Sequence, residues 1–181
     1  MFRDSVAGIY DIFANVINRS ANRSLCEAVG KMIQSDDTVL ECACGTGLLS
    51  GIIAGRCKQL VATDFSEKML RRAEKKYGRL GNVRFERADI LHLNYPDESF
   101  DVVVAANVIH LLDAPQTALA EMNRVCRSGG RLIIPTYMNR SEAGKVGAVS
   151  GAIDRVGADF RQKFTPTAYR RFLGEAGYAD A

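Results

Sequence analysis

The chain contains 181 residues, of which 47% are hydrophobic and 25% charged, and its formal net charge is +3. This balance is typical of one globular domain, excludes a disordered or fibrous protein, and does not indicate nucleic acid or an anionic membrane as partner. No apolar run approaches the roughly 18 residues of a membrane span, and the N-terminus does not read as a secretory signal. Five cysteines, an odd number, predict free thiols and a cytoplasmic protein.

In chain order, the sequence predicts two helices followed by alternating strands and helices. Apolar spacing indicates an amphipathic helix over 5–18 and a second helix over 22–34. Further on, apolar runs predict strands and the segments between them predict helices: strands 38–43, 59–63, 83–86, 100–106 and 131–136, and helices 48–56, 66–78 and 114–127. Ser66 and Asp113 are the expected N-caps.

The central apolar runs lack polar alternation, which favours a parallel sheet buried on both faces. We therefore expect a doubly wound α/β fold whose ligand lies at the carboxyl ends of the strands. No linker or repeat divides the chain, so residues 1–181 are expected to form a single domain. Its expected parts are helices or a lid over 1–34, a ligand-binding core over 38–136, an irregular excursion over 137–164 and a last helix over 165–177. Thr165 and Gly177 are the expected start and stop signals of that last helix.

The strongest functional signal joins the first strand to the following helix and reads Glu41-Cys42-Ala43-Cys44-Gly45-Thr46-Gly47. Its two glycines let the backbone approach a ligand, which is compatible with NAD, FAD, another nucleotide or S-adenosylmethionine. Glu41 would repel the pyrophosphate of a dinucleotide, and Ser50 stands where the dinucleotide pattern has its third glycine. The acid instead favours the sulfonium and ammonium groups of S-adenosylmethionine. The alternative for Glu41 is a carboxylate that only caps neighbouring backbone groups.

Two further acids follow the second and third strands. Asp64 can accept both ribose hydroxyls of an adenosine ligand; the alternative is a helix N-cap. Asp89 can accept from an exocyclic amino group while Ile90 packs on the base, although a loop aspartate without a specific role is an equal alternative.

Taken together, the ordered motifs are E-C-A-C-G-T-G, V-A-T-D-F-S-E-K-M-L, A-D-I, F-D-V-V-V-A-A-N-V-I-H-L-L and R-S-G-G-R-L-I-I. Over about residues 5–178 they resemble the class I S-adenosylmethionine-dependent methyltransferases, most closely the small-molecule branch that includes quinone-biosynthesis C-methyltransferases. The resemblance implies a Rossmann-like methyltransferase fold, S-adenosylmethionine as cofactor, S-adenosylhomocysteine as product and a small-molecule methyl acceptor.

The resemblance also implies the cofactor-binding residues. The glycine-rich segment would surround the methionine part, Asp64 the ribose, Asp89 and Ile90 the adenine, and Asn107 would lie beside the transferred methyl group. The full set is Tyr10, Glu41, Ala43, Gly45, Gly47, Asp64, Phe65, Met69, Asp89, Ile90 and Asn107. Ala43 departs from the family, which usually has glycine there, but alanine is small enough for binding to survive.

His110 is the only catalytic candidate, as a general base or a polar contact to the acceptor; the alternative is a histidine bonded to backbone. Tyr10, Phe13 and the 137–164 segment are candidate walls of an acceptor pocket, although the two aromatic residues could equally pack in the core. Cys42 and Cys44, two apart on one strand, are expected to be packing thiols rather than metal ligands. A solvated helix face is expected for Lys68, Arg71, Arg72, Lys75, Lys76 and Arg79.

Methyl transfer from a sulfonium is an in-line displacement that needs positioning more than acid–base chemistry, so the absence of an evident dyad is no objection. The alternatives are a non-catalytic S-adenosylmethionine-binding module and, opposed by Glu41 and Ser50, an NAD-dependent oxidoreductase. Asn107 is followed by Val108-Ile109 and not by the Pro-Pro of many base methyltransferases, which argues against a nucleic-acid base methyltransferase of that kind but leaves other RNA or protein acceptors open. Nothing in the sequence specifies the acceptor atom, and a monomer or weak dimer is expected.

The last expectation concerns the C-terminal end. The resemblance implies a sixth strand and an antiparallel seventh after Gly177, and four residues are too few to supply them. We therefore expect the sheet to lack its last one or two strands and the fifth strand to be an open edge, relieved by Pro135.

Overall fold

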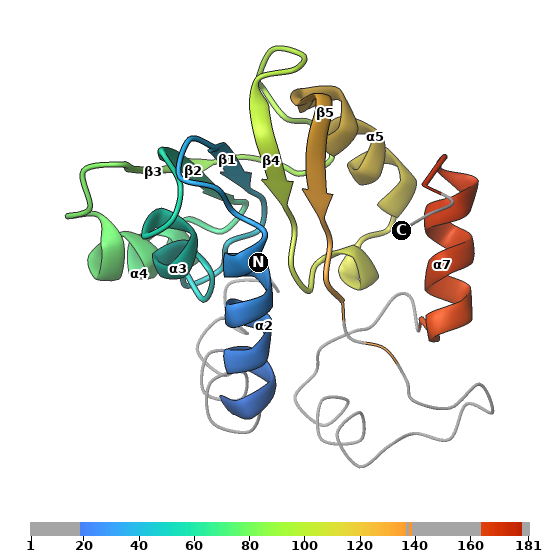
Figure 1. Ribbon diagram of the computed structural model, residues 1–181, viewed down its shortest axis with the longest axis horizontal. Coiled ribbons are helices and arrows are strands. Elements are labelled where there is room, and N and C mark those ends of the chain that lie inside the picture. Colours follow the sequence, from blue (N-terminus) through green and yellow to red (C-terminus); the bar gives the residue numbers. More distant parts are fainter. Residues whose placement is uncertain (1–18, 137, 139–163, 179–181) are drawn as a thin grey trace.

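The structure is a computed structural model that describes residues 19–136, 138 and 164–178 (Figure 1). Its described residues form a five-stranded, wholly parallel sheet in the order β3-β2-β1-β4-β5. The strands are β1 (Thr38–Glu41), β2 (Gln59–Asp64), β3 (Val83–Arg87), β4 (Phe100–Val104) and β5 (Cys126–Ile133). The helices are α2 (Arg19–Lys31), α3 (Ser50–Ala54), α4 (Glu67–Tyr77), the 3₁₀ turn η1 (Ile109–Leu111), α5 (Pro115–Val125) and α7 (Pro166–Glu175). The predicted doubly wound α/β fold is confirmed.

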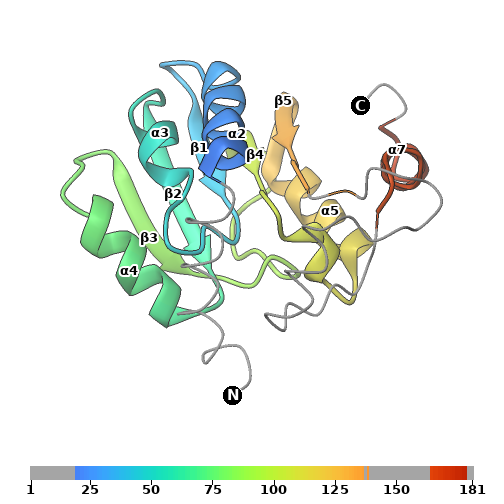
Figure 2. The ribbon, with the colours of Figure 1, turned by 90° about the horizontal axis from the view of Figure 1, so that it is seen from below.

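Helices cover both faces of the sheet, with α2, α3 and α4 on one side and α5 and α7 on the other (Figures 1 and 2). Successive strand residues point to opposite faces, so on β1 Val39 packs in the core beneath α2 and α3 while Leu40 packs in the core beneath α5. Both side chains are fully buried. This two-sided burial is why the central strands read as continuous apolar runs.

The strand order places a topological switch point between β1 and β4. The chain builds outward from β1 through β2 to β3, and then returns to the other side of β1 for β4 and β5. In open α/β sheets the crossovers on the two sides of such a point diverge, and ligands bind at the carboxyl ends of the strands beside it. The residues that follow β1, β2 and β4 therefore meet around one location.

The capping predictions are confirmed at two helices and wrong at a third. The Ser66 and Thr165 hydroxyls accept from Met69 N–H and Ala168 N–H at the starts of α4 and α7. Asp113 is not the N-cap of α5, because the helix begins at Pro115 and Ala114 takes the cap position without a side-chain bond. Proline is favoured in the first turn of a helix but restricts the residue before it, so the start moves one residue along the chain.

Strand β5 begins earlier than predicted and contains a bulge. Cys126 pairs with Phe100 and Arg131 with Val102, so residues 127–130 are looped out of the ladder. Gly129 adopts φ +74° within this bulge, a conformation open to glycine. Helix α5 therefore passes directly into the strand, with no separate turn between them.

Helix α7 contacts the backbone just beyond the end of β5. The carbonyls of Ile133 and Pro135 accept from backbone N–H groups that follow β4, so the Ile134 carbonyl between them faces away from that strand. Tyr169 of α7 donates its hydroxyl to this Ile134 oxygen at 2.5 Å. Gly177, at φ +94°, ends the helix as predicted.

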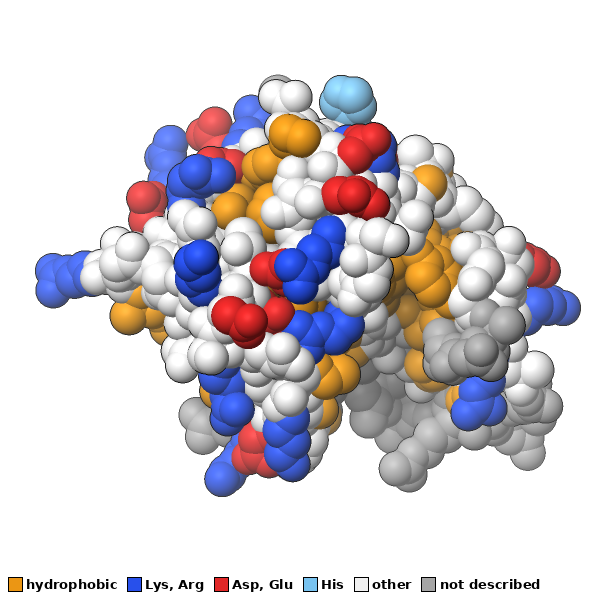
Figure 3. Space-filling model, turned by 45° about the horizontal axis from the view of Figure 1, so that its top comes forward, with side chains coloured by type: hydrophobic (Ala, Val, Ile, Leu, Met, Phe, Trp, Pro, Cys, Tyr) orange, Lys and Arg blue, Asp and Glu red, His pale blue; other side chains and the backbone are white. Residues whose placement is uncertain are grey.

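The surface that lies over the amino ends of the strands carries mixed charge. On the face shown in Figure 3, basic and acidic side chains lie side by side. In the described part of the chain, no helix is long and apolar enough to span a membrane. The helix predicted over 5–18 and the excursion predicted over 137–164, apart from Met138, lie outside the described residues.

Candidate functional site

The turn between β1 and α3 is built on three left-handed residues, Ala43 (φ +53°), Gly45 (φ +57°) and Gly47 (φ +83°). A Cβ on Gly47 would lie 3.0 Å from the Tyr77 ring, so this glycine lets α4 pack against the turn. A Cβ on Gly45 would meet no atom of the described residues within 4 Å. The backbone at Gly45 thus faces open space and can be approached closely by a ligand.

Asp64, the last residue of β2, holds this turn in place. Its Oδ2 accepts from Gly45 N–H and its Oδ1 from Ser66 N–H, both at 2.8 Å. Burial raises the pKa of the Asp64 carboxyl, while these two bonds oppose the shift. Because each carboxylate oxygen has two lone pairs, Asp64 can bind the turn and still accept two ligand hydroxyls.

Helix α4 makes a second set of contacts that hold the turn after β1, and the sequence did not predict them. Lys76, expected on a solvated face, donates from Nζ to the carbonyl of Thr46 at 2.9 Å. Tyr77 lies over both Gly47 and Gly51. An aromatic residue of α4 thus packs against one glycine of the turn and one of α3. The sequence contains all three residues, but their contact can be predicted only once α3 and α4 are known to be neighbours.

Glu41 ends β1 on the α3 side of the sheet and is 3% exposed. Ser50 Oγ donates to its Oε2 at 2.6 Å. No lysine, arginine or histidine of the described residues pairs with this carboxyl group, and burial raises its pKa to about 8. A buried acid without a cation is costly in its charged form, so the position favours a positively charged ligand.

Four predicted cofactor-binding residues, of which Asp89 and Ile90 were predicted at the adenine, follow the neighbouring strands β2 and β3. Phe65 is half exposed, and the Arg87 guanidinium lies 5.1 Å from the centre of its ring. Asp89 is exposed and accepts from Leu91 N–H at 2.9 Å, whereas Ile90 is buried. Met69 lies, half-buried, in the first turn of α4.

Asn107 and His110 follow β4 on the other side of the switch point. Asn107 adopts φ +54° and donates its N–H to Pro135 O at 2.8 Å. His110 is 1% exposed, and its Nδ1 lies 2.8 Å from Thr136 Oγ1. Burial lowers the pKa of His110 to about 4, so the imidazole is neutral at neutral pH. Tyr10 and Phe13 lie outside the described residues.

Hydrogen bonds therefore join the turn after β1 directly to the end of β2. Phe65, Asp89 and Asn107 are placed near this turn only because they follow the strands β2, β3 and β4 of the same sheet. The prediction that Cys42 and Cys44 lie on one strand is wrong. Strand β1 ends at Glu41, so Cys42 packs on the α5 side and Cys44 on the α3 side. All five cysteines are free thiols, as predicted.

The strained turn gives a first testable prediction. A left-handed alanine costs about 1 kcal/mol more than a left-handed glycine, so Ala43→Gly is expected to raise the free energy of unfolding by up to about 1 kcal/mol in urea titration. Ala120, exposed in α5, is the matched control, because Ala120→Gly should lower stability by about 1 kcal/mol. Equal destabilisation by both changes would show that Ala43 carries no backbone strain.

At the switch point, the described residues bring together an open glycine turn, a buried acid with no cationic partner among them, and an aspartate with free acceptor capacity for ribose hydroxyls. These features define an α/β protein with a site for a cationic nucleoside cofactor. A family model described as "Methyltransferase domain" matches residues 40–134. The chain belongs to this family, the S-adenosylmethionine-dependent methyltransferases of class I. S-Adenosylmethionine is accordingly its cofactor, and the resemblance predicted from the motifs is confirmed.

Individual relatives agree with this assignment. A phosphatidylethanolamine N-methyltransferase from Cereibacter sphaeroides is 33% identical over 150 residues, which are 81% of this chain and 71% of that protein. A ubiquinone/menaquinone biosynthesis C-methyltransferase from Teredinibacter turnerae is 36% identical over 140 residues, covering 72% of this chain and 55% of that protein. The chain thus spans about half to seven-tenths of these relatives.

A solved structure shows the same fold. A putative S-adenosylmethionine-dependent methyltransferase from Methanococcus maripaludis superposes with a TM-score of 0.73 at 20% identity, covering 96% of this chain and 83% of that one.

Proposed function

We propose that this chain binds S-adenosylmethionine in the crevice between β1 and β4 and methylates a small-molecule acceptor. The observation that carries the proposal is Glu41, a buried acid without a cation among the described residues, beside a backbone open at Gly45. As a carboxylate, this acid repels the phosphates of a dinucleotide and is stabilised by a ligand with an ammonium and a sulfonium group.

Each proposed binding residue contributes a group suited to one part of the cofactor. Glu41 would accept from the ammonium group, the Gly45–Gly47 backbone would lie along the methionine chain, and Asp64 would accept from both ribose hydroxyls. Phe65, Met69, Asp89 and Ile90 would enclose the adenine. Ala43 shapes the turn, and Asn107 and Tyr10 are proposed beside the methionine part.

When bound, the cofactor supplies a methyl group on a positively charged sulfur. The protein's own part is to orient the acceptor in line with that group and to exclude water, because displacement at an activated carbon gains most from positioning. The relatives' names refer to a phospholipid amine and to quinones, which supports a small organic acceptor. The segments 1–34 and 137–164 are proposed to cover it, in a cytoplasmic monomer or weak dimer without nucleic-acid partners.

Calorimetry tests the first half of this proposal. S-Adenosylmethionine and S-adenosylhomocysteine should both bind the folded chain, in the micromolar range, and NAD should not. Profiling metabolites with isotopically labelled methyl donor and purified protein tests the second half, and a labelled product identifies the acceptor. Binding without any labelled product would favour the non-catalytic alternative, and absence of binding by folded protein would overturn the proposal.

His110 is proposed to contact the acceptor side of the site as a neutral imidazole. Its partner Thr136 follows β5, away from the predicted ribose and adenine residues. His110→Ala is therefore expected to lower turnover about tenfold while leaving the calorimetric affinity for the cofactor unchanged. Thr136→Val, which removes only the hydrogen-bonding partner, should have a smaller effect, and unchanged turnover in both variants would leave His110 a structural residue.

A further inference from the structure

Glu41 is the most deeply buried acid of the candidate site, and among the described residues a single hydroxyl donates to its carboxyl group. Ser50, at the first position of α3, is 0% exposed and donates to Oε2 at 2.6 Å. Nearby, Thr63 donates to the Glu41 backbone carbonyl and not to the carboxyl group. The methyl-transfer reaction itself does not require Ser50, so its buried bond to Glu41 needs a separate explanation.

The groups that surround Glu41 add no positive charge. From β2 the facing group is Asp64, from α2 it is Cys26, and from the turn after β1 they are Cys42 and Cys44. Ser50 is the contribution of α3. Within the part of the chain that the structure describes, the negative charge of Glu41 is thus met by another acid and by thiols, and only the Ser50 bond stabilises it.

We propose that Glu41 carries a proton when the cofactor site is empty and releases it when the cationic cofactor binds, with Ser50 as the positioning residue for both states. This inference rests on the proposed function, because the bound cation is what stabilises the carboxylate. In the step, the O–H bond of the Glu41 carboxyl breaks and the proton passes to solvent, without any redox change. Burial, which raises the pKa of Glu41 to about 8, supports a protonated acid at neutral pH in the empty site.

Ser50 is suited to this exchange because a hydroxyl can both donate and accept. It can accept from a protonated carboxyl and donate to a carboxylate, so the same 2.6 Å contact serves before and after proton release. Its hydrogen bond also lowers the pKa of Glu41 against the effect of burial. Loss of Ser50 should therefore make the proton harder to release and cofactor binding weaker at a given pH.

Calorimetry with S-adenosylmethionine tests the proposal directly. Titrations at pH 6.5 in two buffers with different ionisation enthalpies count the protons released, and the expected number approaches one per site. Between pH 6 and 7 the affinity should rise about tenfold, which is the full effect of one coupled proton. The range stays below the α-amino pKa of about 7.7–8, so that titration of the cofactor itself contributes little.

Three variants separate the role of Glu41 as the titrating group from that of Ser50 as its positioning residue. Glu41→Gln keeps an acceptor for Ser50 but cannot titrate, so its affinity should be independent of pH and no proton should be released. Ser50→Ala should move the affinity profile to higher pH, with about fivefold to tenfold weaker binding at pH 7. Thr63→Val, the matched loss of a buried hydroxyl that does not touch the carboxyl group, should leave the profile in place.

The outcomes distinguish this inference from the function on which it rests. If wild-type protein binds S-adenosylmethionine without releasing a proton and with a flat pH profile, the inference is overturned and the proposed function stands. If folded wild-type protein does not bind the cofactor at all, the proposed function fails. Should Ser50→Ala not fold, the proton count of wild type against Glu41→Gln still decides.

Discussion

Asp64→Ala is expected to weaken S-adenosylmethionine binding by about 1.5–3 kcal/mol, the scale of losing hydrogen bonds to a charged acceptor. Two losses combine in this variant. The proposed ribose contacts disappear, and Gly45 N–H loses the partner that holds it 2.8 Å from Oδ2. Because Gly45 belongs to the turn that approaches the cofactor, the turn should also become less ordered. Calorimetry gives the affinity, and urea unfolding gives the accompanying loss of stability.

Ser66→Ala is the matched control for this experiment. It removes the hydroxyl that caps α4 through Met69 N–H, at a cost of about 1 kcal/mol in stability, without removing the Asp64 carboxylate. Its cofactor affinity should stay close to that of wild type. If Asp64→Ala loses stability but keeps its affinity, Asp64 serves only to anchor the turn, and the ribose assignment must be abandoned.

The parts of the fold that local patterns determine could be predicted. The central strands β1, β2 and β4 could be predicted because their burial on both faces produces continuous apolar runs. The outer strands β3 and β5 are less buried, and the start of β5 was predicted too late. The left-handed turn was signalled by Gly45 and Gly47, and the helix starts at Ser66 and Thr165 by their capping hydroxyls. The prediction of Asp113 as N-cap was wrong because the following Ala-Pro pair, and not the acid, determines where α5 begins.

What the sequence missed depends on contacts between elements. In the sequence, Ser50 only marks the place where the dinucleotide pattern would have its third glycine. In the structure, its hydroxyl donates to Glu41, nine positions earlier in the chain. Its role follows from the angle at which α3 leaves the turn, which no local pattern encodes. The basic composition of its helix predicts that Lys76 lies on a solvated face. Its hydrogen bond to the Thr46 carbonyl forms only because α4 packs beside the turn, and the sequence pattern of the helix does not show this. The positions of Asp89 and Ile90 were predicted, but their binding role stays a prediction.

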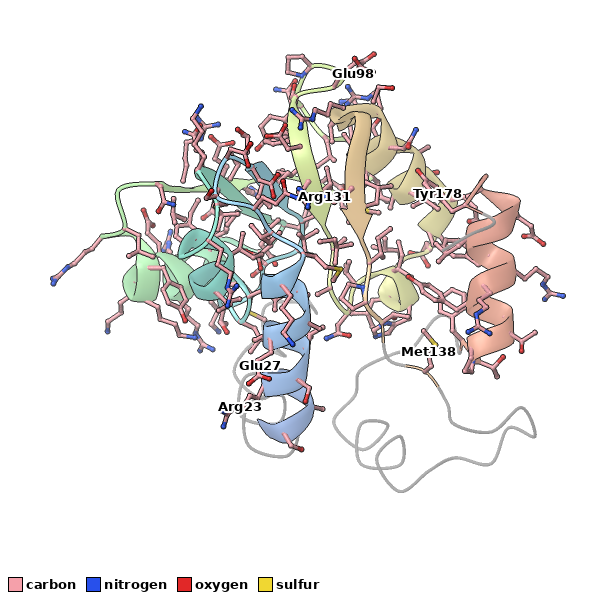
Figure 4. All side chains as sticks on the ribbon, viewed as in Figure 1. Arg23, Glu27, Glu98, Arg131, Met138 and Tyr178 are labelled. Carbon is pink, nitrogen blue, oxygen red and sulfur yellow. The ribbon has the colours of Figure 1, made fainter. Side chains whose placement is uncertain are left out.

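The ion pair between Arg131 and Asp37 is expected to make the largest single contribution to stability among the charged residues of the sheet. Arg131 of β5 (Figure 4) donates to Asp37 Oδ1 at 2.5 Å and to the Met32 carbonyl at 2.8 Å, and so joins the segment between α2 and β1 to the edge strand β5. Asp37 is 3% exposed and also accepts from Gln34 N–H at 2.6 Å. Its carboxylate is thus buried and depends on Arg131 for a counter-charge.

Arg131→Met should lower the free energy of unfolding by about 2–3 kcal/mol, because it leaves the Asp37 carboxylate buried without its cation. The value falls below that of a fully buried pair since the Arg131 side chain is 35% exposed. Arg23→Met is the control, because Arg23 and Glu27 pair on the solvent side of α2 with 83% and 59% exposure (Figure 4). A pair of that kind contributes about 0.5 kcal/mol or less.

A double-mutant cycle in urea with Asp37→Asn separates the ion pair from the other contacts of Arg131. Asparagine keeps an oxygen for Gln34 N–H but removes the buried charge, so Arg131→Met should cost much less in the Asp37→Asn background than in wild type. If Arg131→Met costs the same in both backgrounds, its effect comes from the Met32 contact and from packing alone. If Arg131→Met lowers the free energy of unfolding no more than Arg23→Met does, backbone groups are sufficient to stabilise the Asp37 carboxylate. The position of α2 would then depend on the apolar contacts of Val29 and Ile33 with the sheet.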